Sequence, residues 1–375
     1  MPVPEDDVFF LLALPVVAAA DTERTAEILR GAGGDFDWGR LVDLGLRNRV
    51  LPLIGRNVVR YGALRSAAQR HHGIARDMLA AVYLGNRCRN DALFGEFGRV
   101  IGALRVADVR HAVRKGPALI EHHYVDRGVR QTNDLDLLVS RDDIPVVREV
   151  LDSLGYTQGK VAATGRGVSP FQRSTELLWK AYLNNSLPFV KAAFTDEIDY
   201  FKVDLCHGLL QTRQASGDSA AQLLAQARPA VVCGERSWVL DPVDAVLDLC
   251  AHLHKEANGL RYIRSGKAFE LRKFNDLVVS TAAWDNADWL SLTERATALN
   301  ATVPCFYALA HLTSLYPGVV PEKHLEQLRP DQADQVLDGY GAEDQAPAQW
   351  TNSLRDRLLS GVDHTTIPRS PIPED

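Results

Sequence analysis

Residues 130–139 read Arg-Gln-Thr-Asn-Asp-Leu-Asp-Leu-Leu-Val. The apolar run 135–139 is typical of a buried β-strand, on which residues i and i+2 point to the same face, so Asp134 and Asp136 converge. Such a pair is often merely solvated, but here the flanking strand is apolar, where an idle pair of carboxylates is costly. The two carboxylates repel each other unless a cation lies between them. Because oxygen ligands alone suit a hard cation, we expect Mg²⁺ or Mn²⁺ at Asp134 and Asp136.

The segments around this strand predict a small α/β unit. A strand-like run at 109–113 ends at Lys115-Gly116, and a helix-compatible segment follows at 117–124. After the central strand, Asp142 or Asp143 is placed to cap a helix over 144–154, which Gly155 closes. A further strand is expected at 203–205. Strand, helix, strand, helix and strand form one unit.

Two further features belong with the aspartate pair. Gly116 at a strand-to-helix turn lets a phosphate approach the backbone, and Lys115 beside it is able to hold that phosphate directly, although an ordinary loop lysine has the same pattern. Asp204 lies between Val203 and Leu205, on the opposite face of the predicted strand from both. If the two strands are neighbours, Asp204 completes a carboxylate triad with Asp134 and Asp136; otherwise it is a strand aspartate with a polar partner.

Helical periodicity dominates both ends of the chain. We expect a helical N-terminal annex over 1–106, including a buried helical segment at 8–20, and a core over 107–240. Asp241-Pro242 opens a helical C-terminal domain over 241–365, and the proline-rich tail 366–375 is expected to be disordered.

Composition narrows the class of protein. A net charge of −6 argues against a general nucleic-acid coat, because binding to a phosphate backbone needs surplus Lys and Arg. The 5 cysteines are scattered without a paired motif, which favours free thiols in a reducing compartment. The apolar stretch 8–20 follows acidic residues and is too short to span a bilayer. We therefore expect a cytoplasmic protein without a membrane partner.

Together these motifs resemble the nucleotidyltransferase-fold superfamily, which is DNA polymerase β-like, and in particular its uncharacterised bacterial nucleotidyltransferase family. The matching positions in this chain are Lys115-Gly116, Arg130, the run from Asp134 to Val139, Gly155-Tyr156 and the run from Val203 to His207. Weaker similarity continues through Asp241-Pro242, His252, Asn275-Asp276-Leu277 and Asp288-Trp289. The chain departs from many relatives of the wider superfamily at Gly116-Pro117, where the proline removes one backbone N–H from the phosphate turn.

The resemblance implies an α+β fold, with a small mixed-sheet nucleotidyltransferase core flanked by N-terminal and C-terminal helical regions. It implies a metal-dependent enzyme that transfers an NMP from an NTP to an acceptor hydroxyl or phosphate. Asp134, Asp136 and Asp204 are then the catalytic residues and the ligands of Mg²⁺ or Mn²⁺. The nucleotide-binding residues are Lys115, Gly116, Arg130 and Asn133.

Two other functions remain open on the same residues. One is a tailoring transferase that uses a nucleotide-sugar or another pyrophosphate donor in natural-product biosynthesis, and the other is a non-catalytic nucleotide-binding module. The acceptor is expected to be a small molecule, peptide or protein rather than nucleic acid, because the chain is acidic.

Several histidines and basic residues are further candidates for the site. His252 and His254 lie two apart on a predicted helix and cannot share a metal, so His252 is expected to be packed or hydrogen-bonded, with lining of the site as the alternative. A structural role is favoured for His207. A basic cluster follows the helix that Asp241 opens, and its members are Lys255, Arg261, Arg264 and Lys267. We favour a solvated helix face for this basic cluster, although one member could reach a triphosphate.

Overall fold

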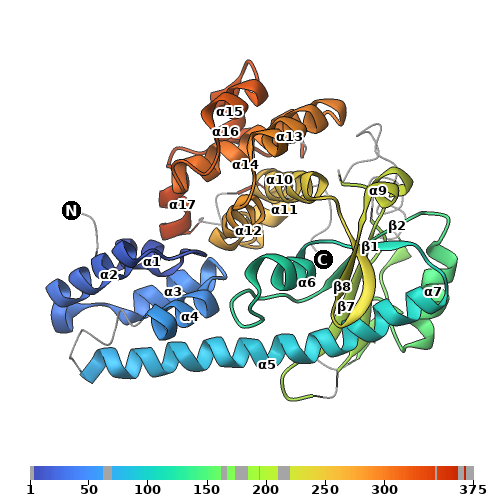
Figure 1. The fold of residues 1–375 in the computed structure, drawn as a ribbon, viewed down its shortest axis with the longest axis horizontal. Coiled ribbons are helices and arrows are strands. Elements are labelled where there is room, and N and C mark those ends of the chain that lie inside the picture. The colour runs from blue at the N-terminus through green and yellow to red at the C-terminus, as the bar shows by residue number, and fades with distance from the viewer. Residues whose placement is uncertain are drawn as a thin grey trace.

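The computed structural model describes residues 4–61, 70–161, 167–173, 185–193, 195–209, 220–342, 344–361 and 367–368. A core built on a mixed sheet is flanked by helices from both ends of the chain (Figure 1). The predicted fold class, an α+β core with N-terminal and C-terminal helical regions, is therefore confirmed.

The N-terminal region is helical. Its elements are α1 (Pro4–Leu12), α2 (Ala19–Ala32), η1 (Gly33–Asp35), α3 (Trp38–Arg47), α4 (Leu51–Tyr61) and α5 (Arg70–Val106). The expected helix at 8–20 is shorter than predicted, since α1 ends at Leu12 and Pro15 lies before α2. Helix α5 is 37 residues long and runs beneath both the N-terminal helices and the core (Figure 1).

The core sheet has seven strands in the order β3-β6-β7-β2-β1-β9-β8. Their bounds are β1 (His111–Val113), β2 (Leu135–Val139), β3 (Thr157–Gln158), β6 (Phe189–Ala192), β7 (Tyr200–Cys206), β8 (Arg228–Val232) and β9 (Glu235–Val239). Between them lie α6 (Lys115–Leu119), η2 (Ile120–Tyr124), α7 (Ile144–Ser153), the hairpin strands β4 (Lys160–Val161) and β5 (Val168–Ser169), and α9 (Ala220–Gln226). The strand expected at 203–205 is thus the central part of β7, beside β2.

Strand alternation gives the sheet two different faces. Leu135, Leu137 and Val139 of β2 join one apolar cluster with Val203 and Leu205 of β7, and α5 and α7 supply further members of that cluster. The alternate residues of both strands, including Asp136 and Asp204, therefore face the other side of the sheet.

The segment after β1 differs from the single helix expected at 117–124. Helix α6 begins already at Lys115, and η2 continues it as a π-type turn. Gly116 has a φ of 29°, a conformation that favours glycine. A Cβ atom there would lie 2.9 Å from the Thr132 hydroxyl, so the turn passes close to the segment that precedes β2.

Two helix starts in this part of the chain behave differently. Of the two residues expected as the cap of α7, Asp143 occupies the N-cap position, but its side chain makes no capping hydrogen bond. Asp241 does cap its helix, accepting a hydrogen bond of 3.0 Å from the Val243 backbone N–H.

The C-terminal region packs above the core in Figure 1. It contains α10 (Pro242–Asn258), α11 (Leu260–Arg264), α12 (Leu271–Thr281), α13 (Asn286–Ala298), α14 (Thr302–Leu315), α15 (Glu322–Leu328), α16 (Ala333–Asp338) and α17 (Leu354–Ser360). Within this region, which was expected to be helical, β10 (Gly339–Tyr340) and β11 (Ala348–Gln349) form a short hairpin. Of the tail expected to be disordered, all but Ile367 and Pro368 lies outside the described residues.

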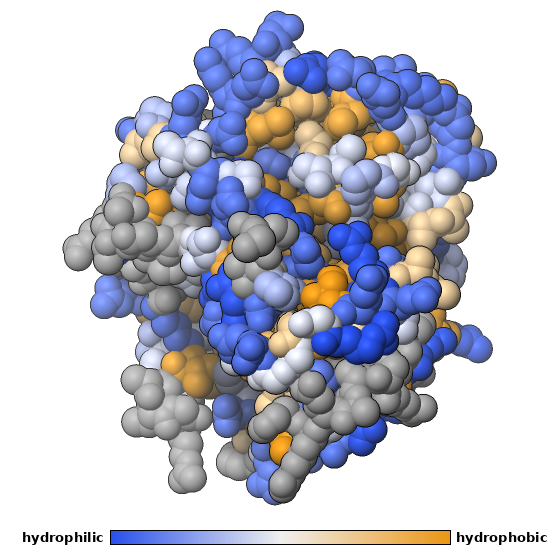
Figure 2. Space-filling view, turned by 90° about the vertical axis from the view of Figure 1, so that its left-hand side faces the viewer, coloured by the Kyte–Doolittle hydropathy of each residue, from blue (hydrophilic) through white to orange (hydrophobic). Residues whose placement is uncertain are grey.

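The two helical regions share one apolar core. Phe9 and Leu12 from α1 belong to the same cluster as Leu247 from α10 and Phe306 from α14. On the face shown in Figure 2, apolar residues gather in the upper half, between more hydrophilic edges. Among the described helices, none is both long and apolar enough to cross a membrane.

Candidate active site

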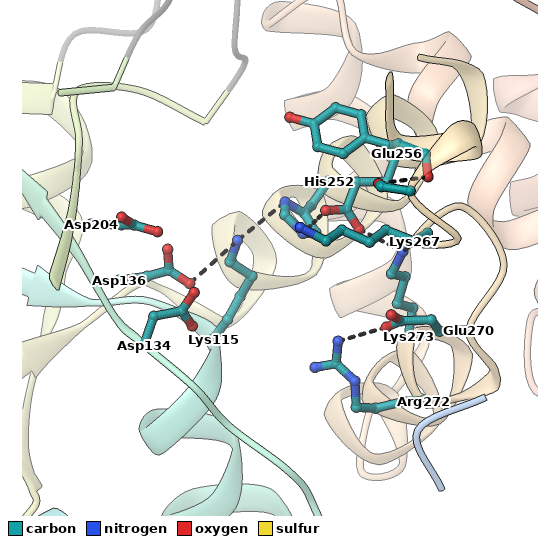
Figure 3. Close-up of polar contacts among 12 residues, drawn as sticks. Lys115, Asp134, Asp136, Asp204, His252, Glu256, Lys267, Glu270, Arg272 and Lys273 are labelled. Carbon is teal, nitrogen blue, oxygen red and sulfur yellow. Dashed lines mark hydrogen bonds and ion pairs between the residues drawn. The ribbon is translucent and has the colours of Figure 1, made fainter. Parts of the chain in front are cut away.

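Three aspartates meet where β2 and β7 lie side by side. The two strands run parallel, and Asp136 is in register with Asp204. Asp134 precedes β2 by one residue and lines the same cavity. In Figure 3 the three carboxylates gather at one side of an open space, which confirms the convergence expected from their spacing.

Lys115 reaches across this space from the start of α6. Its Nζ atom lies 3.6 Å from Asp136 Oδ2 and 3.3 Å from Nδ1 of His252 on α10 (Figure 3). Burial alone would lower the pKa of Lys115, but Asp136 and Asp248 raise it above its usual value. Lys115 therefore carries its positive charge into the gap between the sheet and the C-terminal helices.

A second lysine lies within the aspartate cluster itself. The Nζ atom of Lys202 is 2.6 Å from Asp204 Oδ2 and 3.6 Å from Asp134 Oδ2. Burial opposes the charge of this ammonium group, yet Asp204 and Asp134 raise its pKa. Lys202 was not among the predicted site residues. The signal was present in the sequence, since Lys202 and Asp204 are two apart on one strand and must share a face.

The two facing aspartates differ electrostatically. Burial would raise the pKa of Asp136, but Lys115 and Arg114 outweigh it and hold that pKa at about 2. Burial raises the pKa of Asp204 to about 6; Lys202 opposes this shift, and Asp134 and Asp136 add to it. Asp204 is thus the easier of these two aspartates to protonate, chiefly because it is buried and also because Asp134 and Asp136 lie near it.

A chain of polar contacts continues from Lys115 along the opposite wall. His252 Nε2 lies 3.3 Å from Glu256 Oε1, and Glu256 Oε2 lies 2.5 Å from Nζ of Lys273 on α12. Burial lowers the pKa of His252 to about 4, which Glu256 only partly counteracts. Of the two possibilities for His252, hydrogen-bonded packing and lining of the site, the structure shows both. His254 instead packs edge-on against Tyr307, with ring centroids 5.2 Å apart.

These groups line one large cavity. Its volume is about 1090 Å³, and its walls come from the N-terminal region, the sheet and the C-terminal helices. The four members of the basic cluster all line it, so this cluster is not simply a solvated helix face: Lys255, Arg261, Arg264 and Lys267. The four carboxylates on the same wall each pair with a cation: Asp248 with Arg114, Glu256 with Lys273, Glu270 with Arg272 and Asp276 with Arg130. The wall opposite the aspartates is therefore net positive.

Arg130 and Asn133 lie at the cavity but are held by other protein groups. The Arg130 guanidinium donates two hydrogen bonds to Asp276 of α12, at 2.7 and 2.8 Å, and both side chains are at most 5% exposed. The Asn133 side-chain oxygen accepts a hydrogen bond of 2.8 Å from Arg89 on α5. Their assignment to the nucleotide stays a prediction, while their observed contacts tie the segment before β2 to helices on two sides.

Other residues support the site from behind. Arg114, next to Lys115, forms a buried ion pair with Asp248 on α10. His207 follows β7 and is 4% exposed; its ring contacts the Val139 carbonyl oxygen at 3.2 Å and the Ser186 hydroxyl at 3.0 Å. These contacts agree with the structural role favoured for His207. The partner of Arg114 was not predicted, because it lies far away in the chain.

The donor chemistry of the cluster fits a hard divalent cation. Asp134, Asp136 and Asp204 offer only carboxylate oxygens, on neighbouring strands and against a cavity wall. Among the residues that the structure describes, however, no group of three or more His, Cys, Asp or Glu side chains is already arranged to hold a metal ion. The aspartates are instead paired with Lys115 and Lys202, so a bound metal would have to replace these ammonium groups as their partner.

Comparison with known families now places the chain. A family model described as uncharacterised nucleotidyltransferase matches residues 34–317. All of the residues that line the cavity, from Arg49 to Pro304, fall within the matched segment. No curated protein matches the chain.

Proposed function

The chain belongs to the uncharacterised nucleotidyltransferase family, and from that premise we propose that it transfers an NMP from an NTP to an acceptor hydroxyl or phosphate, with Mg²⁺ or Mn²⁺. The observation that carries the proposal is the pairing of Asp136 with Asp204 on neighbouring parallel strands, with Asp134 beside them. Only two ammonium groups, those of Lys115 and Lys202, pair with these three carboxylates, so an excess of negative charge remains there that favours a bound cation.

Each group at the site has a role in this reaction. A Mg²⁺ or Mn²⁺ held by Asp134, Asp136 and Asp204 would supply positive charge to the phosphates. Lys115 and the Gly116 turn bind the triphosphate, and the basic wall opposite the aspartates adds positive charge there. The net positive wall supports a donor that carries several negative charges.

The bond changes are those of a phosphoryl displacement. An acceptor oxygen forms a bond to the α-phosphorus, the bond from that phosphorus to the bridging oxygen of the β-phosphate breaks, and pyrophosphate leaves. Where the acceptor is a hydroxyl, we assign the role of proton acceptor to Asp204, which lies on the strand next to the Asp134–Asp136 pair. Preorganised positive charge around the transferring group is the main source of rate acceleration in such reactions.

The acceptor is proposed to be a small molecule, peptide or protein. The chain as a whole carries a net charge of −6, and the basic residues named above line the cavity. An extended nucleic-acid backbone needs a positive surface rather than a positive cavity wall.

The test is transfer of label from NTPs carrying a radioactive α-phosphate. The protein is incubated with Mg²⁺ and the small-molecule and protein fractions of a cell extract, and pyrophosphate release is measured in parallel. We expect label in one fraction, loss of transfer in Asp136→Asn, and normal transfer in Asp142→Asn, which removes an exposed aspartate outside the cavity. Label that stays in free nucleotides, with no release of pyrophosphate, would contradict this proposal and favour another transferase reaction.

A further inference from the structure

Lys202 occupies a position that a metal would need. The residue precedes Asp204 by two on β7, so both side chains leave the strand on the same face. Its Nζ atom contacts Asp204 Oδ2 at 2.6 Å and lies 3.6 Å from Asp134 Oδ2. One ammonium group thus bridges two of the three carboxylates proposed to hold the metal.

The cluster is therefore largely neutralised by its own lysines. Three carboxylates face the ammonium groups of Lys115 and Lys202, which leaves a net charge of about −1 when all five groups are ionised. Both lysines are mostly buried, at 11% and 29% exposed, so water screens these pairs only partly. A divalent cation that approaches this cluster meets much less negative charge than three bare aspartates would offer.

The two lysines differ in their partners outside the aspartate cluster. Lys115 has a second partner outside the cluster, His252, at 3.3 Å. Both ion pairs of Lys202 are made within the cluster, to Asp204 and Asp134. A metal that binds these two aspartates must therefore displace Lys202, whose ammonium group then needs another anion.

We propose that Lys202 is a tethered counter-ion that competes with the divalent cation for Asp134 and Asp204, so that the metal binds well only together with the phosphates of the nucleotide. The proposal rests on the metal-dependent function given above. The phosphates bring negative charge that compensates both the metal and the displaced ammonium group. Without a nucleotide, the lysine keeps its place and the metal binds weakly.

The test measures the affinity of the protein for Mn²⁺ without nucleotide. The electron paramagnetic resonance signal of free Mn²⁺ reports how much of the ion remains unbound. Two unit charges about 4 Å apart change a binding constant by between a few-fold and about a thousandfold, depending on screening. We expect Lys202→Gln to bind Mn²⁺ at least about tenfold more tightly than the wild type. Lys202→Arg keeps the charge and should bind as weakly as the wild type.

Lys191 offers a matched control in the same sheet. It lies on β6 and pairs with Glu96 at 2.7 Å, outside the aspartate cluster. Lys191→Gln removes the same charge from the protein and should leave Mn²⁺ affinity within about twofold of the wild type. The double variant Lys202→Gln with Asp204→Asn should not show the tighter binding of Mn²⁺, because the site then lacks one of its carboxylates.

The outcomes separate this inference from the proposed function. Unchanged or weaker Mn²⁺ binding in a folded Lys202→Gln protein, as judged by its thermal unfolding, would overturn the role of Lys202. An equal gain in Lys191→Gln would also overturn it, since the effect would then be a general one of net charge. If Lys202→Gln binds Mn²⁺ more tightly but the protein transfers no label from NTPs, the role of Lys202 as a counter-ion is supported. Only the proposed NMP transfer is then refuted.

Discussion

Replacement of Arg130 by methionine tests whether this residue holds the fold or the nucleotide. The sequence resemblance assigns it to the phosphates, whereas the structure shows its guanidinium bound to Asp276 by two hydrogen bonds of 2.7 and 2.8 Å. The two side chains are 5% and 4% exposed, so neither charge is screened by water. Arg130→Met leaves the Asp276 carboxylate buried, with the Tyr124 hydroxyl at 2.9 Å as a remaining neutral donor.

The expected loss follows from that burial. Removal of one partner of a buried ion pair costs about 3–5 kcal/mol, because the other charge stays buried and uncompensated. We therefore expect the free energy of unfolding, measured with urea and tryptophan fluorescence, to fall by about this amount. Adding Asp276→Asn to Arg130→Met removes the carboxylate charge that was left without its partner. The loss of unfolding free energy in this double variant should therefore be smaller, by at least about 1 kcal/mol, than the two single losses added together.

Arg127 is the matched control. It lies three residues earlier, is 40% exposed, and pairs with Asp91 and Glu121 at 3.1 and 2.8 Å. Arg127→Met should cost less than about 1 kcal/mol, as exposed ion pairs do. If Arg130→Met unfolds like the wild type but loses affinity for the triphosphate, the structural reading is refuted and the phosphate assignment holds.

Three further predictions concern the site and the C-terminal core. Asp136→Asn should abolish metal-dependent NTP binding in calorimetry, whereas Asp204→Asn should keep much of the NTP affinity and lower turnover by roughly 10²-fold, the scale of a lost general base. Lys115→Ala should weaken NTP binding, measured by the same calorimetry, by about 1–3 kcal/mol, the range of a charge-assisted hydrogen bond. Burial lowers the pKa of His311 to about 4, so between pH 6.5 and 4 the unfolded chain binds more protons there than the folded protein. Lowering the pH from 7 to 5 should therefore reduce the free energy of unfolding by about 2 kcal/mol more in the wild type than in His311→Gln. Urea titrations at both pH values measure this, and an equal loss in the two proteins would contradict the prediction.

The parts of the site that could be predicted depend on local geometry. Alternation along a strand places Asp134 and Asp136 together and puts Asp204 on the polar face of its own strand. The same rule places Lys202, two residues before Asp204 on β7, on that face as well. Gly116 was likewise expected from its place at a strand-to-helix turn, and its φ of 29° agrees with that expectation.

The parts that could not be predicted depend on contacts between distant segments. The partners of Arg114 and Arg130 lie 134 and 146 residues away, at Asp248 and Asp276. Periodicity shows only that a helix has an apolar face, and it does not say which loop that helix meets. The basic cluster was for this reason expected on a solvated face, although the packing of α10 and α11 turns it toward the aspartates.

These distant pairs explain why the aspartates do not form a complete site on the sheet alone. Arg114, Lys115 and Arg130 belong to the core, and each contacts a residue of α10 or α12: Asp248, His252 and Asp276. Two of these contacts are buried ion pairs, which are costly to separate, so the C-terminal helices are held at a defined position over the aspartates. The third, between Lys115 and His252, joins a neutral ring to an ammonium group and is the weakest of the three. We therefore propose that Lys115 is the contact exchanged for a phosphate when the nucleotide binds, while the two ion pairs keep the basic wall in place.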